Sequence, residues 1–139
     1  MTGKLTLRVI TPDRIVLDTQ VESVKVPAVD GSMGFLPRHA ALVAALDIGQ
    51  LAWREGGKEH RLFVSGGFAE VRQDTVRVVS EAGERPEEID VERARAAEKR
   101  ARERLDQGRE TGAQIDILRA ELALRRAQVR LRAASRPRL

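Results

Sequence analysis

The chain has 139 residues, of which 42% are hydrophobic, and a formal net charge of +4; this suits one domain, or a small domain with an appendage. The chain has no cysteine and only two histidines, His39 and His60. This composition excludes disulfides, thiol catalysis and cysteine- or histidine-rich metal sites. Tyrosine is absent and tryptophan occurs once, which argues against an aromatic platform for single-stranded nucleic acid.

The first residues, MTGKLTLRVI, lack the pattern of a signal peptide. No apolar run approaches the ~20 residues of a membrane-spanning helix. We therefore expect a protein of the cytosol, or one bound to a surface that faces the cytosol, without direct membrane insertion. From Gln114 onward, seven arginines stand against Asp116 and Glu121, a net charge of +5. A basic segment of this kind suits nucleic acid, acidic lipid or an acidic protein surface.

Residues 4–80 have the pattern of a β domain. Apolar and polar residues alternate in KLTLRVI, and further short segments rich in Val, Leu and Phe follow. The further expected strands are RIVLD, VESVKVP, QLAWRE, EHRLFVS, FAEVR and TVRVVS. The expected turns are TPDR (11–14), Asp30-Gly31, Gly49, Gly56-Gly57, Gly66-Gly67 and Gln73-Asp74. Short strands at this spacing predict a sandwich or barrel.

From Asp90 onward the apolar period becomes helical. The first apolar stripe runs from Val91 to Leu105, with Asp90 as a good N-cap and Pro86 preventing an earlier start. GRETGA (108–113) is expected to break this helix. A second stripe contains Ile115, Leu118, Leu122 and Val129, with Ile117, Ala120, Leu124, Ala127 and Leu131 beside it. We expect an antiparallel two-helix hairpin, with order ending near Pro137.

This hairpin is expected to bring arginines together. Suppose that the turn centres near residues 109–110. Two residues then lie at the same height on the antiparallel helices when their numbers sum to about 219. Arg93 is therefore expected to lie level with Arg126, and Arg130 level with Asp90. Arg100 is two turns from Arg93, and Arg126 and Arg130 are an i,i+4 pair.

Two interpretations of these four arginines stay open. In the first, Glu88, Glu92 and Glu121 neutralise them, and the hairpin is a solvated, salt-bridged surface. In the second, the arginines bind a polyphosphate, because their planar guanidinium groups suit phosphate oxygens. Glu84 and Asp90 at one end could then accept hydrogen bonds from an adenine amino group.

The segment DGSMGFLPRHAALVAAL (30–46) has Asp-Gly and Met-Gly steps typical of turns, and His39 is typical of a loop or edge histidine. Gly31 and Gly34 do not form a phosphate-binding loop, since no Lys-Ser/Thr follows them. The sequence offers no Ser/His/Asp or Cys/His set and no metal set. We therefore expect no catalytic residue and no metal site.

Five segments taken together are similar to one family. They are VITPDRIVLD, VDGSMGFLPRHAALVAALDIGQL, FVSGGFAEVRQDTVRVVSEAGER, EEIDVERARAAEKRA and IDILRAELALRRAQVRL. In order, and over nearly the whole chain, they closely resemble the epsilon subunit of bacterial F-type ATP synthase. The resemblance implies a ten-stranded β-sandwich at residues 1–83 and a regulatory helical hairpin at residues 84–139.

The resemblance also implies a function. The subunit would be a non-catalytic part of the central stalk of a proton-translocating ATP synthase, at the cytoplasmic side of the cell membrane. Its sandwich would bind the gamma subunit and the c-subunit ring, and its extended hairpin would meet the catalytic beta subunits and block ATP hydrolysis. The implied contact loop contains Gly31, Ser32, Met33, Gly34, Arg38 and His39. Ser32, Arg38 and Ala41 depart from the acidic residue, glycine and proline common in the family.

Some bacterial members of the family bind ATP on the folded hairpin as a regulator, not as a substrate, through an I/L-D-x-x-R-A motif. The resemblance carries this role to Glu84, Ile89, Asp90, Arg93, Ala94, Arg100, Arg126 and Arg130. It leaves open any part played by Mg²⁺.

Four alternatives remain: the same subunit without meaningful ATP binding, a basic hairpin that binds nucleic acid, an independent ATP-hydrolysing enzyme, and a sandwich adaptor outside any rotary motor.

Overall fold

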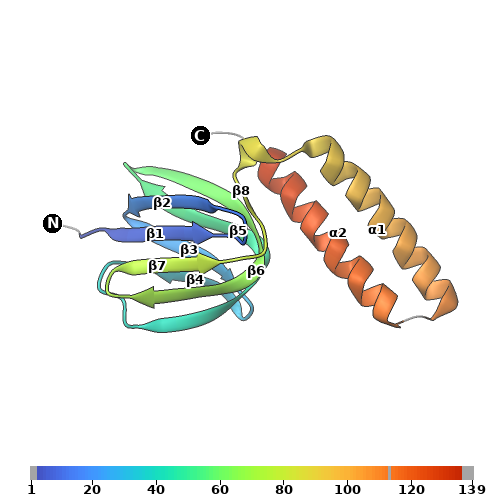
Figure 1. The fold of residues 1–139 in the computed structure, drawn as a ribbon, viewed down its shortest axis with the longest axis horizontal. Helices are drawn as coiled ribbons and strands as arrows, with labels where there is room; N and C mark the ends of the chain where they lie inside the picture. The colour runs from blue at the N-terminus through green and yellow to red at the C-terminus, as the bar shows by residue number, and fades with distance from the viewer. Residues whose placement is uncertain (1–2, 113, 136–139) are drawn as a thin grey trace. The chain divides into compact units, whose positions relative to one another are not determined.

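The computed structural model describes residues 3–112 and 114–135, so the expectation for Pro137 lies outside the described residues (Figure 1). The chain divides into two compact units, Met1–Arg85 and Pro86–Leu139. The first unit consists of strands and the second of helices, as the change in apolar period near residue 90 predicts.

The first unit is one sheet folded into a sandwich. Its strands are β1 (Leu5–Ile10), β2 (Ile15–Val21), β3 (Ser23–Ala28), β4 (Gly31–Phe35), β5 (Leu42–Glu55), β6 (Lys58–Arg72), β7 (Thr75–Val79) and β8 (Gly83–Glu84). They follow the order β2-β1-β7-β6-β5-β3-β4, with β8 paired to β6. All pairs are antiparallel except β1 with β7, which sets the first strand beside the seventh in parallel. Strands distant in sequence are therefore neighbours in this sheet.

The expectation of ten strands is wrong, because this sheet has eight strands. Gly49 was expected to be a turn but lies inside β5, and Gly66 and Gly67 lie inside β6. These two strands pair with each other from Leu42↔Val71 to Glu55↔Lys58, on both sides of the glycines. Gly66 and Gly67 have φ values of 98° and 100°, which only glycine adopts readily, so the strand is redirected without ending.

The segment 31–35 was also misassigned, because it was expected to form turns. It is strand β4, which pairs with β3 from Val24↔Phe35 to Ala28↔Gly31. Gly31, Ser32 and Gly34 are exposed, whereas Met33 is half-buried against the core and Phe35 is buried, so the inward alternation covers only the last three residues. Pairing with a neighbouring strand forms it, despite a low strand propensity.

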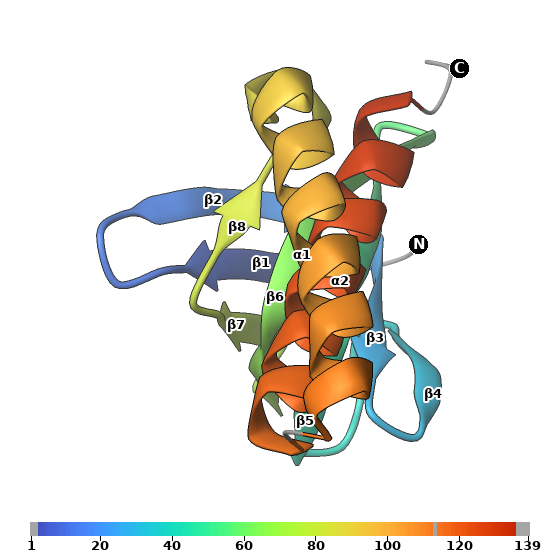
Figure 2. The same ribbon diagram turned by 90° about the vertical axis from the view of Figure 1, so that its right-hand side faces the viewer.

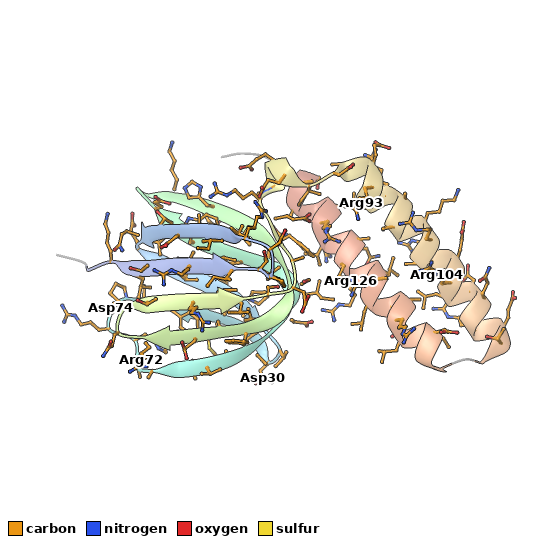
Figure 3. The ribbon with its side chains drawn as sticks, viewed as in Figure 1. Asp30, Arg72, Asp74, Arg93, Arg104 and Arg126 are labelled. Carbon is orange, nitrogen blue, oxygen red and sulfur yellow. The ribbon has the colours of Figure 1, made fainter. Side chains whose placement is uncertain are left out.

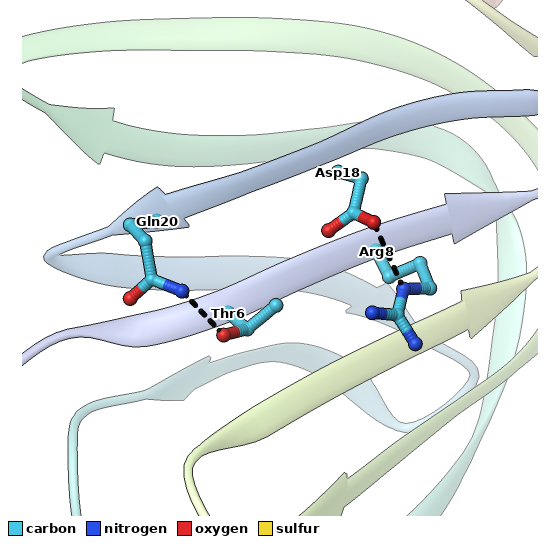
Figure 4. A network of polar contacts seen from close by, with 4 residues as sticks. All are labelled: Thr6, Arg8, Asp18 and Gln20. Carbon is cyan, nitrogen blue, oxygen red and sulfur yellow. Dashed lines mark hydrogen bonds and ion pairs between the residues drawn. The ribbon is translucent and has the colours of Figure 1, made fainter.

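The core of the sandwich forms from the inward residues of alternating strands. In β1, Leu5, Leu7 and Val9 are all 0% exposed, whereas the residues between them are half-buried. On the outer side, Gln20 Nε2 donates to Thr6 Oγ1 at 2.6 Å and Arg8 Nε lies 3.3 Å from Asp18 Oδ2, both across β1 and β2 (Figure 4). The period-2 alternation therefore assigned each face correctly.

The predicted turn at 11–14 is confirmed between β1 and β2. The amide of Thr11 donates to the carbonyl of Arg14 at 3.0 Å, and the Thr11 hydroxyl donates to Asp13 Oδ1 at 2.7 Å. This hydroxyl bond is the main reason that the pKa of Asp13 lies below its ordinary value. The turn is thus fixed by a side chain that is itself buried.

The second unit contains a short 3-10 turn, η1 (Pro86–Glu88), and two helices, α1 (Val91–Thr111) and α2 (Gln114–Ser135). The helices run side by side in opposite directions in both views, which confirms the hairpin (Figures 1 and 2). The predicted break at 108–113 is wrong in extent: α1 continues to Thr111, and Gly112 ends it in the left-handed region at φ 71°.

Small residues form the seam between α1 and α2. Ala94, Ala101 and Gly108 are buried on α1, and Ala120 and Ala127 are buried on α2. A Cβ on Gly108 would lie only 2.9 Å from Ile117 Cγ1, so the helices approach closely at this glycine. The stripe expected from Leu118 and Leu122 does not form the seam, because these side chains are 58% and 37% exposed.

Candidate functional site

The motif Ile89–Ala94 builds the beginning of α1. Asp90 adopts an extended backbone conformation, and its Oδ1 accepts from the Arg93 amide at 3.0 Å, which confirms it as the N-cap. Ile89 and Ala94 are 7% and 4% exposed, so they are structural residues of the unit's interior. Of these four residues, only Arg93 presents a long charged side chain to the exterior.

Two stripes of arginine run along opposite sides of α1. At about 100° per residue, Arg93, Arg100 and Arg104 fall within about 40° of one another around the axis. The opposite stripe, half a turn away, is made of Arg95, Arg102 and Arg109. Each of these is paired: Arg95 with Glu92 at 3.0 Å, Arg102 with Glu98 at 3.4 Å and Arg109 with Asp106 at 3.6 Å.

The first stripe lacks such partners. Within the described part of the chain, the guanidinium groups of Arg93, Arg100 and Arg104 have no carboxylate within ion-pair distance. Glu92, expected to neutralise this side, pairs instead with Arg95. Carboxylates of α1 therefore neutralise the arginines on one side of this helix and not those on the other.

The register of the hairpin differs from the expected one. Because Gly108 lies against Ile117, residues whose numbers sum to about 225 are level, not 219. Arg100 is therefore level with Arg126, and Arg93 is nearly level with Arg130, whereas the expected pairing of Arg93 with Arg126 is wrong. The shift arises because α1 extends through Gly108, which moves the turn about three residues along the chain.

A groove between the two helices collects further arginines. It has a volume of about 640 Å³, and its lining includes Arg104 from α1 and Arg119 and Arg126 from α2. Arg119, Arg126 and Arg130 fall within about 40° around α2, so this stripe faces the same groove side as the unpaired stripe of α1. Figure 3 labels Arg93 and Arg104 on α1 and Arg126 on α2. Sequence reasoning missed Arg104 and Arg119, although their spacing of four from Arg100 and seven from Arg126 indicated the same face.

We name the set Arg93, Arg100, Arg104, Arg119, Arg126 and Arg130 the arginine ladder. Of the ATP-site residues expected from the sequence, the structure brings seven into the helical unit. Glu84 belongs to the chain's first unit, in β8, where it pairs with Phe63 of β6. Chemically, the arginine ladder offers several guanidinium donors for an anion. No group of three His, Asp or Glu able to hold a metal ion occurs among the described residues.

The expected contact loop, Gly31–His39, comprises β4 and the turn that follows it. The Arg38 amide donates to Asp74 Oδ1 at 2.6 Å, and the ring of His39 meets Phe35 edge-on at 5.0 Å. Leu36 is 64% exposed at the tip, so this turn presents an apolar side chain beside charged ones. Asp74 and Arg72 are labelled in Figure 3.

Arg38 holds a left-handed backbone conformation, with φ 66°, which strains a residue that has a Cβ. We expect Arg38→Gly to raise the free energy of unfolding by about 0.5–1 kcal/mol, since relief of strain exceeds the added entropy of the unfolded chain. Arg38→Ala keeps the strain and should leave stability nearly unchanged in urea denaturation. An equal gain in both variants would assign the effect to the arginine side chain.

None of the helices in the described residues is long and apolar enough to cross a membrane.

Comparison with known proteins covers both units. Two family models match: the β-sandwich domain of the ATP synthase delta/epsilon chain at residues 4–86 and its long α-helix domain at residues 87–135. The chain is 50% identical to an ATP synthase epsilon chain of Symbiobacterium thermophilum over 132 residues, which is 94% of this chain and 93% of the relative. It is 48% identical to that of Halalkalibacterium halodurans over 132 residues, 95% and 98% of the two chains.

Among solved structures, the fold is similar to a chain in the mitochondrial ATP synthase of Euglena gracilis, an OSCP/F1/c-ring assembly. The TM-score is 0.79 at 28% identity, over 96% of this chain and 82% of the other. Sequence and fold agree over both units, from the sandwich through the hairpin. The chain therefore belongs to the family of epsilon subunits of bacterial F-type ATP synthases.

Proposed function

We propose that this chain is a non-catalytic rotor subunit of the central stalk, and that its helical hairpin binds ATP as a regulatory ligand. The rotor role rests on family membership along the whole chain and on similarity to a chain of an F1/c-ring assembly. In this role the sandwich contacts the gamma subunit and the c-subunit ring. The subunit then lies at the cytoplasmic side of the membrane as part of a proton-translocating complex.

One observation supports the ATP site above all: the arginines on one side of α1 are unpaired among the described residues, while those on the opposite side have carboxylate partners. Guanidinium groups aligned on one side of a helix repel one another unless an anion neutralises them. A triphosphate supplies that charge, together with oxygens that accept from several guanidinium groups. Arg93, Arg100, Arg126 and Arg130 are the proposed ligands of the phosphates, with Asp90 toward the adenine. The part of Glu84, which belongs to the first unit, stays a prediction.

ATP would then control which state the hairpin occupies. A ligand that binds only the folded hairpin stabilises it by RT ln(1 + [L]/Kd), about 2.7 kcal/mol at a hundredfold excess over Kd. When ATP falls, the hairpin extends, and the net positive charge of its second helix draws it to acidic surfaces of the catalytic beta subunits. Because this attraction is electrostatic, inhibition of ATP hydrolysis should weaken as salt rises.

Calorimetric titration of the purified chain with ATP, ADP and GTP tests the ATP site. Saturable one-to-one binding that prefers ATP is the expected result, and omission of Mg²⁺ in a parallel titration defines the metal's part. The absence of binding up to millimolar ATP would refute the ATP site while leaving the rotor role standing. Co-purification with the gamma subunit tests that role separately.

A second candidate function has its own support. Leu118 and Leu122 are exposed on α2 beside basic residues, a surface suited to a partner protein with apolar and acidic groups. On this account the arginines serve the beta subunits, and the hairpin acts as coupling element and brake without meaningful ATP binding.

A further inference from the structure

We propose that the end of the hairpin nearest its turn carries a second anion site, which takes inorganic diphosphate or a similar phosphate-type anion. Its principal ligands are Arg104 of α1 and Arg119 of α2. The site is distinct from the proposed ATP site, which lies toward the beginning of α1, and the two share only Arg126. The proposal does not depend on ATP binding.

The groove gives this site its form. The polar residues of its lining come from both helices: Arg104, Gln107 and Thr111 from α1, and Asp116, Arg119 and Arg126 from α2. Its volume of about 640 Å³ is well within the range of roughly 300–1,000 Å³ of small-molecule sites. A diphosphate fits such a space with room for its hydration.

The two principal arginines are close to level across the hairpin. Because Gly108 contacts Ile117, residues whose numbers sum to about 225 lie at the same height on the two helices. Arg104 and Arg119 are offset from this register by two residues, about 3 Å along the helix axis. The same contact keeps the helices close, because Gly108 has no side chain to separate them. Two guanidinium groups can therefore act on one anion from opposite walls.

Charge is the second argument. Arg104, Arg119 and Arg126 have no ion pair with any carboxylate in the part of the chain described by the structure. In the same stretch of α1, Arg102 and Arg109 on the opposite side are paired with Glu98 and Asp106. The helix thus has carboxylates for its outward arginines and, among the described residues, none for those in the groove.

Asp116 is the one acidic side chain in this lining as described, and it has no ion pair with the arginines. It stands in the first turn of α2, where a negative charge is favourable to the helix. Toward a ligand, its carboxylate repels a fully ionised phosphate and accepts a hydrogen bond from a protonated one. We therefore expect preference for hydrogen diphosphate over more highly ionised forms.

The test is calorimetric titration of the full chain with sodium diphosphate at constant ionic strength. Saturable binding is expected, with affinity about tenfold lower in Arg104→Ala and in Arg119→Ala, since each loses a charge-assisted contact. Arg102→Ala is the matched control: it removes the same charge from the same stretch but from the paired side, and should change affinity less than twofold. Asp116→Asn should tighten binding of fully ionised diphosphate about threefold by removing a repulsive charge, and so reduce the preference for the protonated form.

Circular dichroism verifies that each variant keeps its helices, as expected for alanine in a helix interior. The proposal is overturned by the absence of saturable diphosphate binding, or by equal losses in Arg102→Ala and Arg104→Ala, which would indicate general charge attraction. Arg93→Ala separates the two sites: it should weaken ATP and spare diphosphate. Diphosphate binding without ATP binding would leave this site intact and refute only the ATP site.

Discussion

Arg126→Ala is expected to weaken ATP binding about 10- to 100-fold. Arg126 is level with Arg100, lines the groove, and has no carboxylate partner among the described residues, so its guanidinium is available to phosphate oxygens. Loss of one charge-assisted contact corresponds to about 1.5–3 kcal/mol of binding free energy. Calorimetric titration with ATP at fixed ionic strength measures the change directly.

The neighbouring residue provides the control. Arg125→Ala removes the same charge one position away, on a different side of α2, and should reduce affinity less than twofold. If Arg125→Ala and Arg126→Ala lose affinity equally, ATP responds to the net charge of α2 and not to a defined site. If neither variant changes affinity, the phosphates are bound elsewhere and the assignment of Arg126 is wrong.

Gly67→Ala should destabilise the sandwich by about 3–5 kcal/mol, enough to unfold a marginally stable unit. A Cβ at this position would lie 1.9 Å from the carbonyl oxygen of Val79 and 3.0 Å from Ser80 Cα. Both are backbone atoms, at and just beyond the end of the strand that pairs with β6, so no rotation of a side chain relieves the clash. Urea denaturation followed by the fluorescence of Trp53 reports the loss.

Gly57→Ala separates the clash from backbone strain. Gly57 also has a positive φ, 76°, but no atom lies within 4 Å of the position that an added Cβ would take, so only conformational strain remains. Its substitution should destabilise by about 1–2 kcal/mol. Equal losses at the two glycines would show that contact with Val79 contributes nothing.

Much of the fold was predictable because its signals are local. The alternation of β1, the turn at 11–14 and the Asp90 cap each depend on residues a few positions apart. The glycines in β5 and β6 gave the opposite result. A glycine has the same local sequence signature in a turn and inside a strand. Only the pairing of β5 with β6 beyond these glycines distinguishes the two, and that pairing is nonlocal.

The prediction of where α1 ends was wrong for a related reason. Gly108 was assigned to the break because glycine has low helix propensity. In the structure its missing side chain makes room for Ile117, so packing between the helices retains it inside α1. This one contact shifts the register of the hairpin, and with it the pairing of the arginines across the groove.

The candidate site was predictable in composition but not in arrangement. Helical spacing placed Arg93 with Arg100 and Arg126 with Arg130, and the resemblance to epsilon subunits identified the same residues. The partner of Glu92 was predictable, because Arg95 is three residues after it on the helix and Ala96 is four, whereas the adjacent Arg93 points to a different side. The Glu92–Arg95 pair leaves the side of α1 that carries Arg93 positive.

The seam of alanine and glycine has a consequence for the regulation proposed above. A buried methyl contributes about 0.8 kcal/mol, so the four buried alanines of the seam contribute about 3 kcal/mol, to which the buried Leu105 adds. That is close to the free energy that a ligand at a hundredfold excess over its Kd supplies. A seam of leucines would clamp the helices shut whatever the nucleotide level. If ATP binds as proposed, alanines at these positions let the binding free energy of the ligand compete with the packing of the seam.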